Sequence, residues 1–274
     1  MRQTKTAGPC VGSESRSGGV AVDAEERRRA ILEATRRVGS VDVGKTAAEL
    51  GISKETVRRD LNLLDAHGLV RRTHGGAYPV ESAGFETTLS YRTTSQVREK
   101  SRIAAAAVEL LGDAETVYID EGYTPQLIAA ALPRDRPLTV ITSSLAAAGT
   151  LTAVESITVL LLGGRVRSAT LATVDHWATH MLSGLVIDLA YVGANGISRQ
   201  WGLTTPDPAV SDVKAQVMAA SRRRVFSGVH NKFGATSFCR FAEIADIEAI
   251  VTDTGLPASE AHRYFLLGPQ VIRV

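Results

Sequence analysis

The chain has 274 residues, 44% of them hydrophobic and 22% charged, a composition typical of a globular protein with a substantial core. Its formal net charge of +2 excludes a polycation that binds nucleic acid over its whole surface. Two cysteines, no apolar run of about 18 residues and no apolar leader argue against a disulfide framework, a membrane span and a secretory signal, so we expect a cytoplasmic protein.

The first part of the chain predicts a tail followed by a helix. Residues 1–22 are rich in Gly, Ser, Arg and Thr without periodicity, which is typical of a disordered tail. The next stretch, Ala24–Gly39, has the helical period. We expect Ile31, Thr35 and Val38 to face inward on this helix and its arginines to face outward.

A second pair of helices follows, joined by a tight turn. A short helix, Thr46–Leu50, is expected to end at Gly51, the residue best suited to a left-handed cap. Ser53 is a suitable N-cap for the longer helix Ser53–Asp65. That helix carries an apolar stripe at i, i+4 and i+7, formed by Val57, Leu61 and Leu64. The arrangement predicts a helix-turn-helix, whereas the longer helix alone also fits an ordinary amphipathic helix with a solvated charged face.

The stretch after this helix favours a nucleic-acid-binding function. We expect the helix to end at Gly68 and two short β-prone pieces to follow around a basic, Gly-rich tip, as in the wing of a winged helix. Residues 24–78 carry eleven Lys or Arg and eight Asp or Glu, a small local basic excess. We predict contacts to double-stranded DNA from Ser53, Lys54, Glu55, Thr56, Arg58, Arg59, Arg71, Arg72 and His74.

The run Thr56-Val57-Arg58-Arg59-Asp60-Leu61, followed by Gly68-Leu69-Val70 and Arg72-Thr73-His74-Gly75-Gly76-Ala77, closely resembles the DeoR family of bacterial transcriptional regulators. The resemblance implies a winged helix that reads operator DNA, and a second domain, similar in fold to ribose-5-phosphate isomerase, that senses sugar phosphates or related metabolites within a homo-oligomer. It extends from about residue 24 to the end, through Gly163-Gly164, Tyr191–Ile197, Gly202–Pro206, Asp212–Lys214, Asn231–Gly234 and Val251–Asp253.

The remainder of the chain alternates strands and helices. Near-continuous apolar strands separated by helices predict an α/β domain with a mainly parallel sheet and helices on both faces. The predicted strands are Thr116–Asp120, Leu138–Ser143, Ile157–Leu162, Asp188–Gly193, Arg224–Val229, Ala249–Asp253 and Gln270–Val274. We therefore divide the chain into the tail 1–22, a winged helix-turn-helix domain 23–80, a linker 81–97 and an α/β effector-sensing and oligomerisation domain 98–274.

The ends of the predicted strands suggest a ligand site. In open parallel sheets, ligands bind outside the carboxyl ends of the strands, and here those ends carry small, polar or charged residues. The alternative is that these loops use Gly, Ser and Asp only for turns and caps. Given the resemblance, we favour an effector pocket formed by Asp120, Glu121, Gly122, Tyr123, Thr124, Ser143, Gly163, Gly164, Arg165, Asn195, Lys214, His230 and Lys232.

The first strand end departs from the family pattern. The family has Asp-Ser-Gly-Thr-Thr, whose hydroxyls and backbone N–H groups hold a phosphate at a helix N-terminus, where this chain has Asp120-Glu121-Gly122-Tyr123-Thr124. A carboxylate at Glu121 repels such an anion, and Tyr123 fills part of its space. The family's Asp-Ser-Ser-Lys is Val229-His230-Asn231-Lys232 here, its Gly-Pro is Asp175-His176, and Ser143 stands where Asn is common.

These departures predict an altered effector. We expect a ligand other than an ordinary small sugar phosphate: a neutral one, one with a cationic group, or a larger one reached by Tyr123 and His230. The alternative is that Glu121 points outward while an anion site is still supplied by Arg165, Arg167, Lys214 and Lys232.

The sequence as a whole predicts a metabolite-responsive repressor of a carbohydrate-related operon. The first alternative is an effector-independent DNA-binding protein whose second domain only oligomerises. The second is an isomerase-like enzyme with Asp120, Glu121 and Lys232 as an acid–base set, against which the DNA-binding domain argues. We expect no enzyme activity, no cofactor and no metal, since only His176 and His180 have a metal-ligand spacing on a helix.

Overall fold

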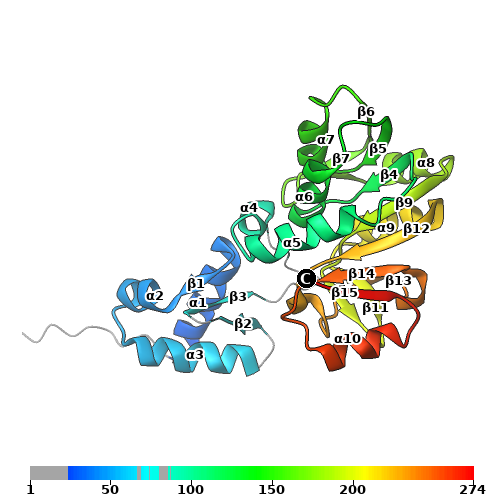
Figure 1. The fold of residues 1–274 in the computed structure, drawn as a ribbon. Coiled ribbons are helices and arrows are strands. Elements are labelled where there is room, and N and C mark those ends of the chain that lie inside the picture. Colours follow the sequence, from blue (N-terminus) through cyan, green and yellow to red (C-terminus); the bar gives the residue numbers. More distant parts are fainter. Residues whose placement is uncertain (1–23, 67–68, 74, 80–85, 87) are drawn as a thin grey trace, which may run out of the picture.

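The computed structural model describes residues 24–66, 69–73, 75–79, 86 and 88–274. The predicted tail at residues 1–22, the expected helix end at Gly68 and the candidate DNA contact His74 lie outside these described residues. The described elements form two bodies (Figure 1): helices α1, α2 and α3 with strands β1, β2 and β3, and a large sheet with its helices, with α5 beside the junction.

The smaller body is a winged helix-turn-helix. Its helices are α1 (Ala24–Val38), α2 (Val43–Leu50) and α3 (Lys54–Ala66), and its strands β1 (Val41–Asp42), β2 (Val70–Arg72) and β3 (Gly76–Pro79) form an antiparallel sheet in the order β1-β3-β2. One hydrophobic cluster joins the three helices to the wing: Ile31, Val43, Ala47, Val57, Leu61, Leu64, Val70 and Ala77. The apolar stripe expected from the sequence is therefore the inner face of α3.

Local signals set the ends of α2 and α3. The Asp42 carboxylate accepts hydrogen bonds from two backbone N–H groups of the first turn, at 2.8 and 2.9 Å, so α2 begins three residues before the expected Thr46. Gly51 ends α2 with a left-handed φ of 63°. The Ser53 hydroxyl caps α3 by accepting from the Thr56 N–H at 3.1 Å, as the sequence predicts.

Two expectations for α1 are wrong. Val38 is 64% exposed, because α1 ends there and Gly39, with φ of 86°, turns the chain toward β1. Arg27 does not lie on the outer face, since its guanidinium donates to the buried Asp60 at 2.6 Å. The buried positions Ile31 and Thr35 agree with the prediction.

The segment that follows the wing is held on the larger body from Glu86 onward. Glu86 forms ion pairs with Arg92 at 2.8 Å and with Arg167 at 2.6 Å. Helix α4 (Leu89–Arg92) lies within the residues interpreted as a linker, and α5 (Val97–Val108) follows it. This anchoring brings residues 92–100 against the end of the large sheet.

Seven of the described strands form one sheet in which every neighbouring pair is parallel. They are β4 (Thr116–Ile119), β5 (Leu138–Thr142), β6 (Ile157–Leu161), β9 (Ile187–Val192), β12 (Ser221–Ser227), β14 (Ala249–Thr252) and β15 (Gln270–Arg273). The seven predicted strands are confirmed, with ends moved by up to three residues. The order β15-β14-β12-β9-β4-β5-β6 reverses direction at β4, so the crevice beside β4 and β9 is the switch point at which such sheets bind ligands.

Helices cover both faces of this sheet, as predicted. Helices α5, α6 (Tyr123–Ala131) and α7 (Leu145–Leu151) share one hydrophobic cluster with alternate strand residues such as Val117 and Ile119. Tyr118, between these two, belongs to the cluster on the other face, with α8 (His176–Ser183), α9 (Pro208–Ala220) and α10 (Ala258–Phe265). Most residues of the inner strands β4, β5, β9 and β14 are therefore apolar, because both faces are buried there.

Two smaller sheets were not predicted. Strands β10 (Gly196–Ser198), β11 (Gly202–Thr205) and β13 (Cys239–Ala242) form an antiparallel sheet, and β7 (Arg165–Arg167) pairs with β8 (Ala172–Val174). The short 3-10 helices η1 (His230–Lys232) and η2 (Ile244–Asp246) lie in loops after β12 and β13. None of the described helices is both long and apolar enough to cross a membrane.

Candidate functional site

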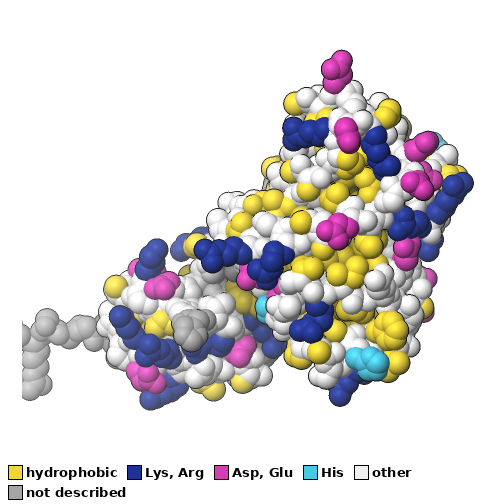
Figure 2. Space-filling view, in the orientation of Figure 1, with side chains coloured by type: hydrophobic (Ala, Val, Ile, Leu, Met, Phe, Trp, Pro, Cys, Tyr) yellow, Lys and Arg dark blue, Asp and Glu magenta, His cyan; other side chains and the backbone are white. Residues whose placement is uncertain are grey.

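The outer face of α3 gathers most of the predicted DNA contacts. Lys54, Glu55, Arg58 and Arg59 are exposed there, and Arg58 pairs with Glu55 at 3.4 Å. Figure 2 shows Lys and Arg side chains spread over this body, with acidic side chains among them. The helix thus presents exposed cations on a rigid element, the arrangement that positions a helix in a major groove.

A buried ion pair holds α3 in place. Asp60, on the inner side of α3, accepts from Nε of Arg27 at 2.6 Å and from its Nη2 at 3.2 Å, and Arg28 lies 3.8 Å away. The pair fixes the orientation of α3 relative to α1. It also explains why two of the arginines assigned to the outside of α1 face inward.

The two arginines of β2 point to opposite sides of the wing. Arg72 is half-buried and donates to the Arg58 carbonyl at 3.1 Å and to the side-chain oxygen of Asn62. Arg71 lies opposite Tyr78 in the β2–β3 register and lines a cavity between the two bodies. Successive strand residues alternate sides, so Arg72 braces α3 and Arg71 faces the larger body.

A buried carboxylate, Asp120, lies beneath this cavity at the switch point and does not line it. Asp120, directly after β4, accepts from the backbone N–H of Glu121 at 2.8 Å and from that of Gly193 at 2.7 Å. Lys214 of α9 donates to the same carboxylate and to the Gly193 carbonyl at 3.2 Å. The ends of β4 and β9 are therefore tied to α9 beneath the cavity.

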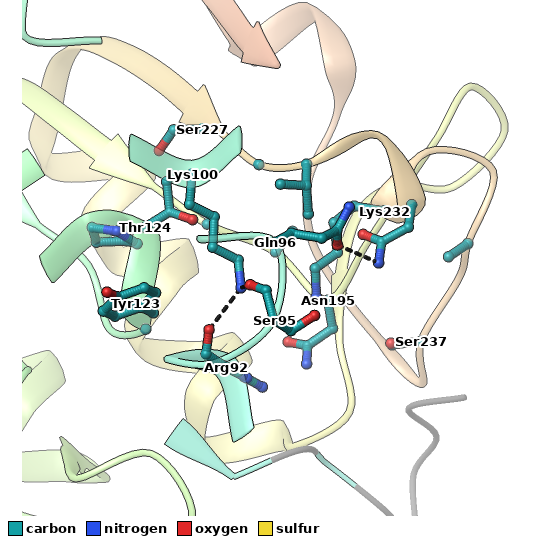
Figure 3. A pocket seen from close by; sticks show the side chains of 18 of the residues that line it. Arg92, Ser95, Gln96, Lys100, Tyr123, Thr124, Asn195, Ser227, Lys232 and Ser237 are labelled. Atoms are coloured by element: carbon teal, nitrogen blue, oxygen red, sulfur yellow. Dashed lines mark hydrogen bonds between the residues drawn. The ribbon is translucent and has the colours of Figure 1, made fainter. Parts of the chain in front are cut away.

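The cavity has a volume of about 340 Å³. Its walls come from the ends of β4, β9 and β12, from η1, and from the segment leading into α5; Figure 3 shows Ser227, Asn195 and Lys232 around it, together with Arg92, Ser95, Gln96 and Lys100. Wing residues Arg71, Tyr78 and Pro79 complete it. The volume is in the range of sites for small organic ligands.

Among the charged side chains that line the cavity in the described part of the chain, cations outnumber carboxylates, although Arg92 is paired with Glu86 and Lys214 with Asp120. The cations are Arg71, Arg92, Lys100, Lys214 and Lys232, against one carboxylate, Glu121. Lys100 is buried and its ammonium group donates to the Arg92 carbonyl at 2.7 Å and to the Ser95 carbonyl; the same group lies 5.7 Å from the centroid of the Tyr123 ring. This excess of positive charge favours a ligand with an anionic group.

Glu121 does not point outward, as one reading of the sequence supposed: it is only 7% exposed and lines the cavity. Burial raises the pKa of its carboxyl group, and the carboxylates of Glu86 and Asp120 reinforce that rise, while the Lys214 and Arg92 cations oppose it. Its Oε2 atom lies 4.0 Å from Nη1 of Arg167. Its Oε2 atom has no hydrogen-bond partner among the described residues.

Two further buried polar atoms at the cavity lack a partner among the described residues. They are Oγ of Ser227, at the end of β12, and Oδ1 of Asn231, in η1. The amide nitrogen of Asn231 donates to Oε1 of Gln96 at 3.0 Å (Figure 3) and to the Tyr78 hydroxyl at 3.4 Å. Unpaired buried polar atoms are uncommon in proteins, and three of them around one cavity mark a place for a polar ligand.

The structure brings together about half of the predicted effector residues. Those that line the cavity are Glu121, Gly122, Tyr123, Thr124, Asn195, Lys214 and Lys232, with Asp120 beneath them. The others do not line it. The Ser143 and Tyr118 hydroxyls lie 3.1 Å apart, and His230 pairs with Asp253 at 2.6 Å. Gly163, Gly164 and Arg165 surround a separate hollow, where Arg165 pairs with Asp175 at 2.9 Å.

Several lining residues were not predicted. Ser227 lies within the predicted strand Arg224–Val229, so the rule of strand ends could have found it. Arg92 and Gln96 belong to the predicted linker 81–97 and Lys100 to the start of the predicted α/β domain, and none of the three stands at a strand end. Within the described part of the chain no group of three or more His, Cys, Asp or Glu side chains is placed to hold a metal ion.

Comparisons with known proteins agree with this architecture. Residues 95–254 match the DeoR C terminal sensor domain and residues 27–83 match the DeoR-like helix-turn-helix domain. The HTH-type transcriptional regulator GlpR of Haloferax volcanii is 33% identical over 90% of this chain and 96% of its own length. The glycerol-3-phosphate regulon repressor of Escherichia coli is 30% identical over 85% of this chain and 92% of its own length.

A relative of lower sequence identity and a solved structure are also similar to this chain. The putative aga operon transcriptional repressor of Escherichia coli O157:H7 is 26% identical over 91% of this chain and 93% of its own length. Among solved structures, ribose 5-phosphate isomerase A from Methanocaldococcus jannaschii covers 51% of this chain and 55% of that chain, at 18% identity and a TM-score of 0.37. A likeness of that size supports no argument.

Proposed function

The chain belongs to the DeoR family of transcriptional regulators, and on that premise we propose that it is a repressor released from operator DNA by a small metabolite. Two relatives are named as repressors, which supports the sign of the regulation. One of them is named for the glycerol-3-phosphate regulon, which supports a carbohydrate-related operon as the target.

The DNA contacts are assigned to α3 and the wing. Thr56, Arg58 and Arg59, with the exposed first turn of α3, face the major groove, because the opposite side of this helix packs in the hydrophobic cluster. Arg72 holds the wing against α3, since its guanidinium is bound to the Arg58 carbonyl and to Asn62. This makes Arg72 a positioning residue as well as a source of positive charge.

The observation that supports sensing best is the cavity at the switch point with three buried polar atoms, on Glu121, Ser227 and Asn231, that have no hydrogen-bond partner among the described residues. A buried polar atom without a partner costs about 1–3 kcal/mol. A chain that keeps three of them around one cavity is built to receive hydrogen-bond donors from a ligand. This favours a sensor over the alternative in which the second domain only oligomerises.

The lining chemistry indicates a polyol with an anionic group. The cationic lining attracts a phosphate or carboxylate, and a hydroxyl or ammonium group of the ligand donates to Glu121. The Glu121 carboxylate repels an anion from the start of α6. We therefore place the anionic group toward Lys232, which differs from the family's usual phosphate cradle.

A thermal-shift screen of the full chain tests this function. The panel contains sn-glycerol 3-phosphate, hexose phosphates, hexosamine phosphates and the corresponding free polyols. A ligand at a hundred times its dissociation constant stabilises the folded state by about 2.7 kcal/mol. We expect a phosphorylated polyol to give the largest shift, a result that would contradict the altered effector expected from the first strand end. A protein that binds DNA and ignores the whole panel would contradict sensing and favour the oligomerisation-only alternative.

We propose that the site senses its ligand without transforming it. Asp120, one member of the acid–base set considered from the sequence, is bound to Lys214 and two backbone N–H groups and does not line the cavity. Its carboxylate is therefore engaged in structure. Turnover of ribose 5-phosphate above background that disappears in Lys232→Ala would overturn this assignment.

We also propose a homo-oligomer. Trp177 and Met181 are exposed beside Gly163, near the end of the edge strand β6, on which Leu160 and Leu161 are also exposed. Neighbouring exposed apolar side chains are typical of protein contacts. Sedimentation of the wild type and of Trp177→Ala tests this: an assembly that is weakened by the substitution is expected, and a wild-type monomer at all concentrations would contradict it.

A further inference from the structure

The wing of the DNA-binding body forms one wall of the cavity. Arg71 of β2 and Tyr78 of β3 are direct partners in the antiparallel register, so their side chains lie on the same face of the wing. Both line the cavity, with Pro79 beside them. The neighbouring Arg72 is on the other face and binds α3. One strand therefore carries one arginine toward the recognition helix and one toward the cavity.

Asn231, in η1 after β12, links this wall to the larger body. The Asn231 amide nitrogen donates to the Tyr78 hydroxyl at 3.4 Å and to Gln96 at 3.0 Å. Its Oδ1 atom is buried at the cavity without a partner among the described residues. Gln96 itself has a left-handed φ of 50°, a conformation that costs energy for a residue other than Gly. At the contact between the wing and the larger body, the amide nitrogen of Asn231 is therefore hydrogen-bonded, while its Oδ1 atom can still accept a hydrogen bond from a ligand in the cavity.

We propose that the effector site is composite and that Arg71 and Tyr78, two residues of the DNA-binding domain, bind the effector directly. The proposal rests on the sensing function argued above. The Arg71 guanidinium pairs with the anionic group of the ligand. The Tyr78 hydroxyl and Oδ1 of Asn231 bind its hydroxyl groups. A bound ligand then attaches the wing to the sheet through contacts that neither body supplies alone.

This arrangement couples ligand binding to DNA binding directly at the wing, so no conformational change has to pass through the core of either body. Arg71, which the sequence predicts as a DNA contact, lines the cavity in this structure. While it binds the ligand's anionic group it cannot also bind a DNA phosphate, so the ligand and the DNA compete for this side chain. The coupling is reciprocal, because each partner weakens the other's binding by the same factor. The wing thereby acts in both recognition events.

The experiment measures ligand affinity in the full chain by calorimetry, with sn-glycerol 3-phosphate and inorganic phosphate as probes. Arg71→Ala removes the proposed charge and Tyr78→Phe removes only a hydroxyl. Arg37→Ala is the matched control, since Arg37 is an exposed arginine of the same domain that does not line the cavity. We expect a loss of affinity for sn-glycerol 3-phosphate of tenfold or more in Arg71→Ala, a several-fold loss in Tyr78→Phe, and no change in Arg37→Ala.

The outcomes separate this inference from the proposed function. Binding of sn-glycerol 3-phosphate that is equal in the wild type, Arg71→Ala and Tyr78→Phe overturns the composite site and leaves the sensor intact. Equal losses in Arg71→Ala and Arg37→Ala also overturn it, because they indicate a general effect of charge. Absence of binding by both probes and by every phosphorylated polyol of the panel overturns the sensing function, and the composite site with it.

Discussion

The carboxylate of Asp120, at the end of β4, and the ammonium group of Lys214, on α9, form a nearly inaccessible ion pair, with side-chain exposures of 1% and 4%. We predict that Lys214→Met lowers the free energy of unfolding by about 3–5 kcal/mol, because it leaves the Asp120 carboxylate buried and uncompensated. Adding Asp120→Asn to this variant is expected to restore part of the loss. Urea denaturation of the two single variants and the double variant measures the coupling, and strictly additive losses would contradict it.

The ion pair of Arg27 with Asp60 gives a second prediction. Arg27→Ala leaves the Asp60 carboxylate buried, so we expect the winged helix to lose about 3 kcal/mol of stability. Arg29→Ala is the control, since Arg29 is exposed and pairs only with the exposed Glu33; its loss is expected to stay below about 0.5 kcal/mol. Thermal unfolding followed by circular dichroism compares them, and similar melting temperatures would show that the pair is not needed.

Two arginines are expected to act differently in DNA binding. Arg59→Ala, on the exposed face of α3, is predicted to cost about 1–3 kcal/mol on a duplex selected from a random library by the wild type, and little on random duplex. Arg72→Ala is predicted to weaken both, because Arg72 braces α3 from the wing. Titrations over a range of salt concentrations test this division. Identical losses on the two duplexes for both variants would argue against it.

Glu121 gives a prediction on pH. Burial raises its pKa above the ordinary value, so the folded state binds this proton more tightly than the unfolded chain. Ionisation of the buried carboxyl group therefore costs no folding stability below its ordinary pKa. The loss of stability grows as the pH rises through the pKa of the group in the folded state. We expect Glu121→Gln to be about 1–3 kcal/mol more stable than the wild type at pH 8 and to match it at pH 4.

The control for this effect is Glu155→Gln, at an exposed position outside the cavity. It is expected to follow the wild type at every pH. A stability difference for Glu121→Gln that stays constant between pH 4 and pH 8 would mean that the substitution acts by shape rather than by charge. Denaturant unfolding at each pH supplies the comparison.

Much of the fold could be predicted from periodicity, because its elements bury continuous apolar stretches. The stripe of Val57, Leu61 and Leu64 and the seven strands of the parallel sheet were found in this way. Helix ends were less certain: α2 begins earlier than predicted because one carboxylate, that of Asp42, satisfies its first N–H groups. The small antiparallel sheets were missed because their short strands, such as Arg165–Arg167 and Gly202–Thr205, contain charged, polar or Gly residues and no continuous apolar run.

The candidate site was only half predictable, for a physical reason. The rule of strand ends finds residues on the sheet, such as Glu121 and Asn195, whose neighbours are fixed by the topology. It cannot find Arg71, Tyr78 or Lys100, which reach the cavity through contacts between segments that no local pattern encodes. The same rule assigns every strand end to one site, whereas Gly163, Gly164 and Arg165, which follow β6, surround a separate hollow.

The ion pairs of Glu86 set the length of chain between the wing and its first anchor on the larger body. Pro79 closes β3 and Glu86 is fixed to the larger body, so the two points are seven residues apart along the chain. A fully extended chain of this length spans at most about 25 Å. In an assembly, the winged helix of each subunit therefore stays within this distance of its own Glu86. We expect the positions of the Glu86 anchors, and thus the arrangement of the larger bodies, to limit which half-site spacings two winged helices can reach together.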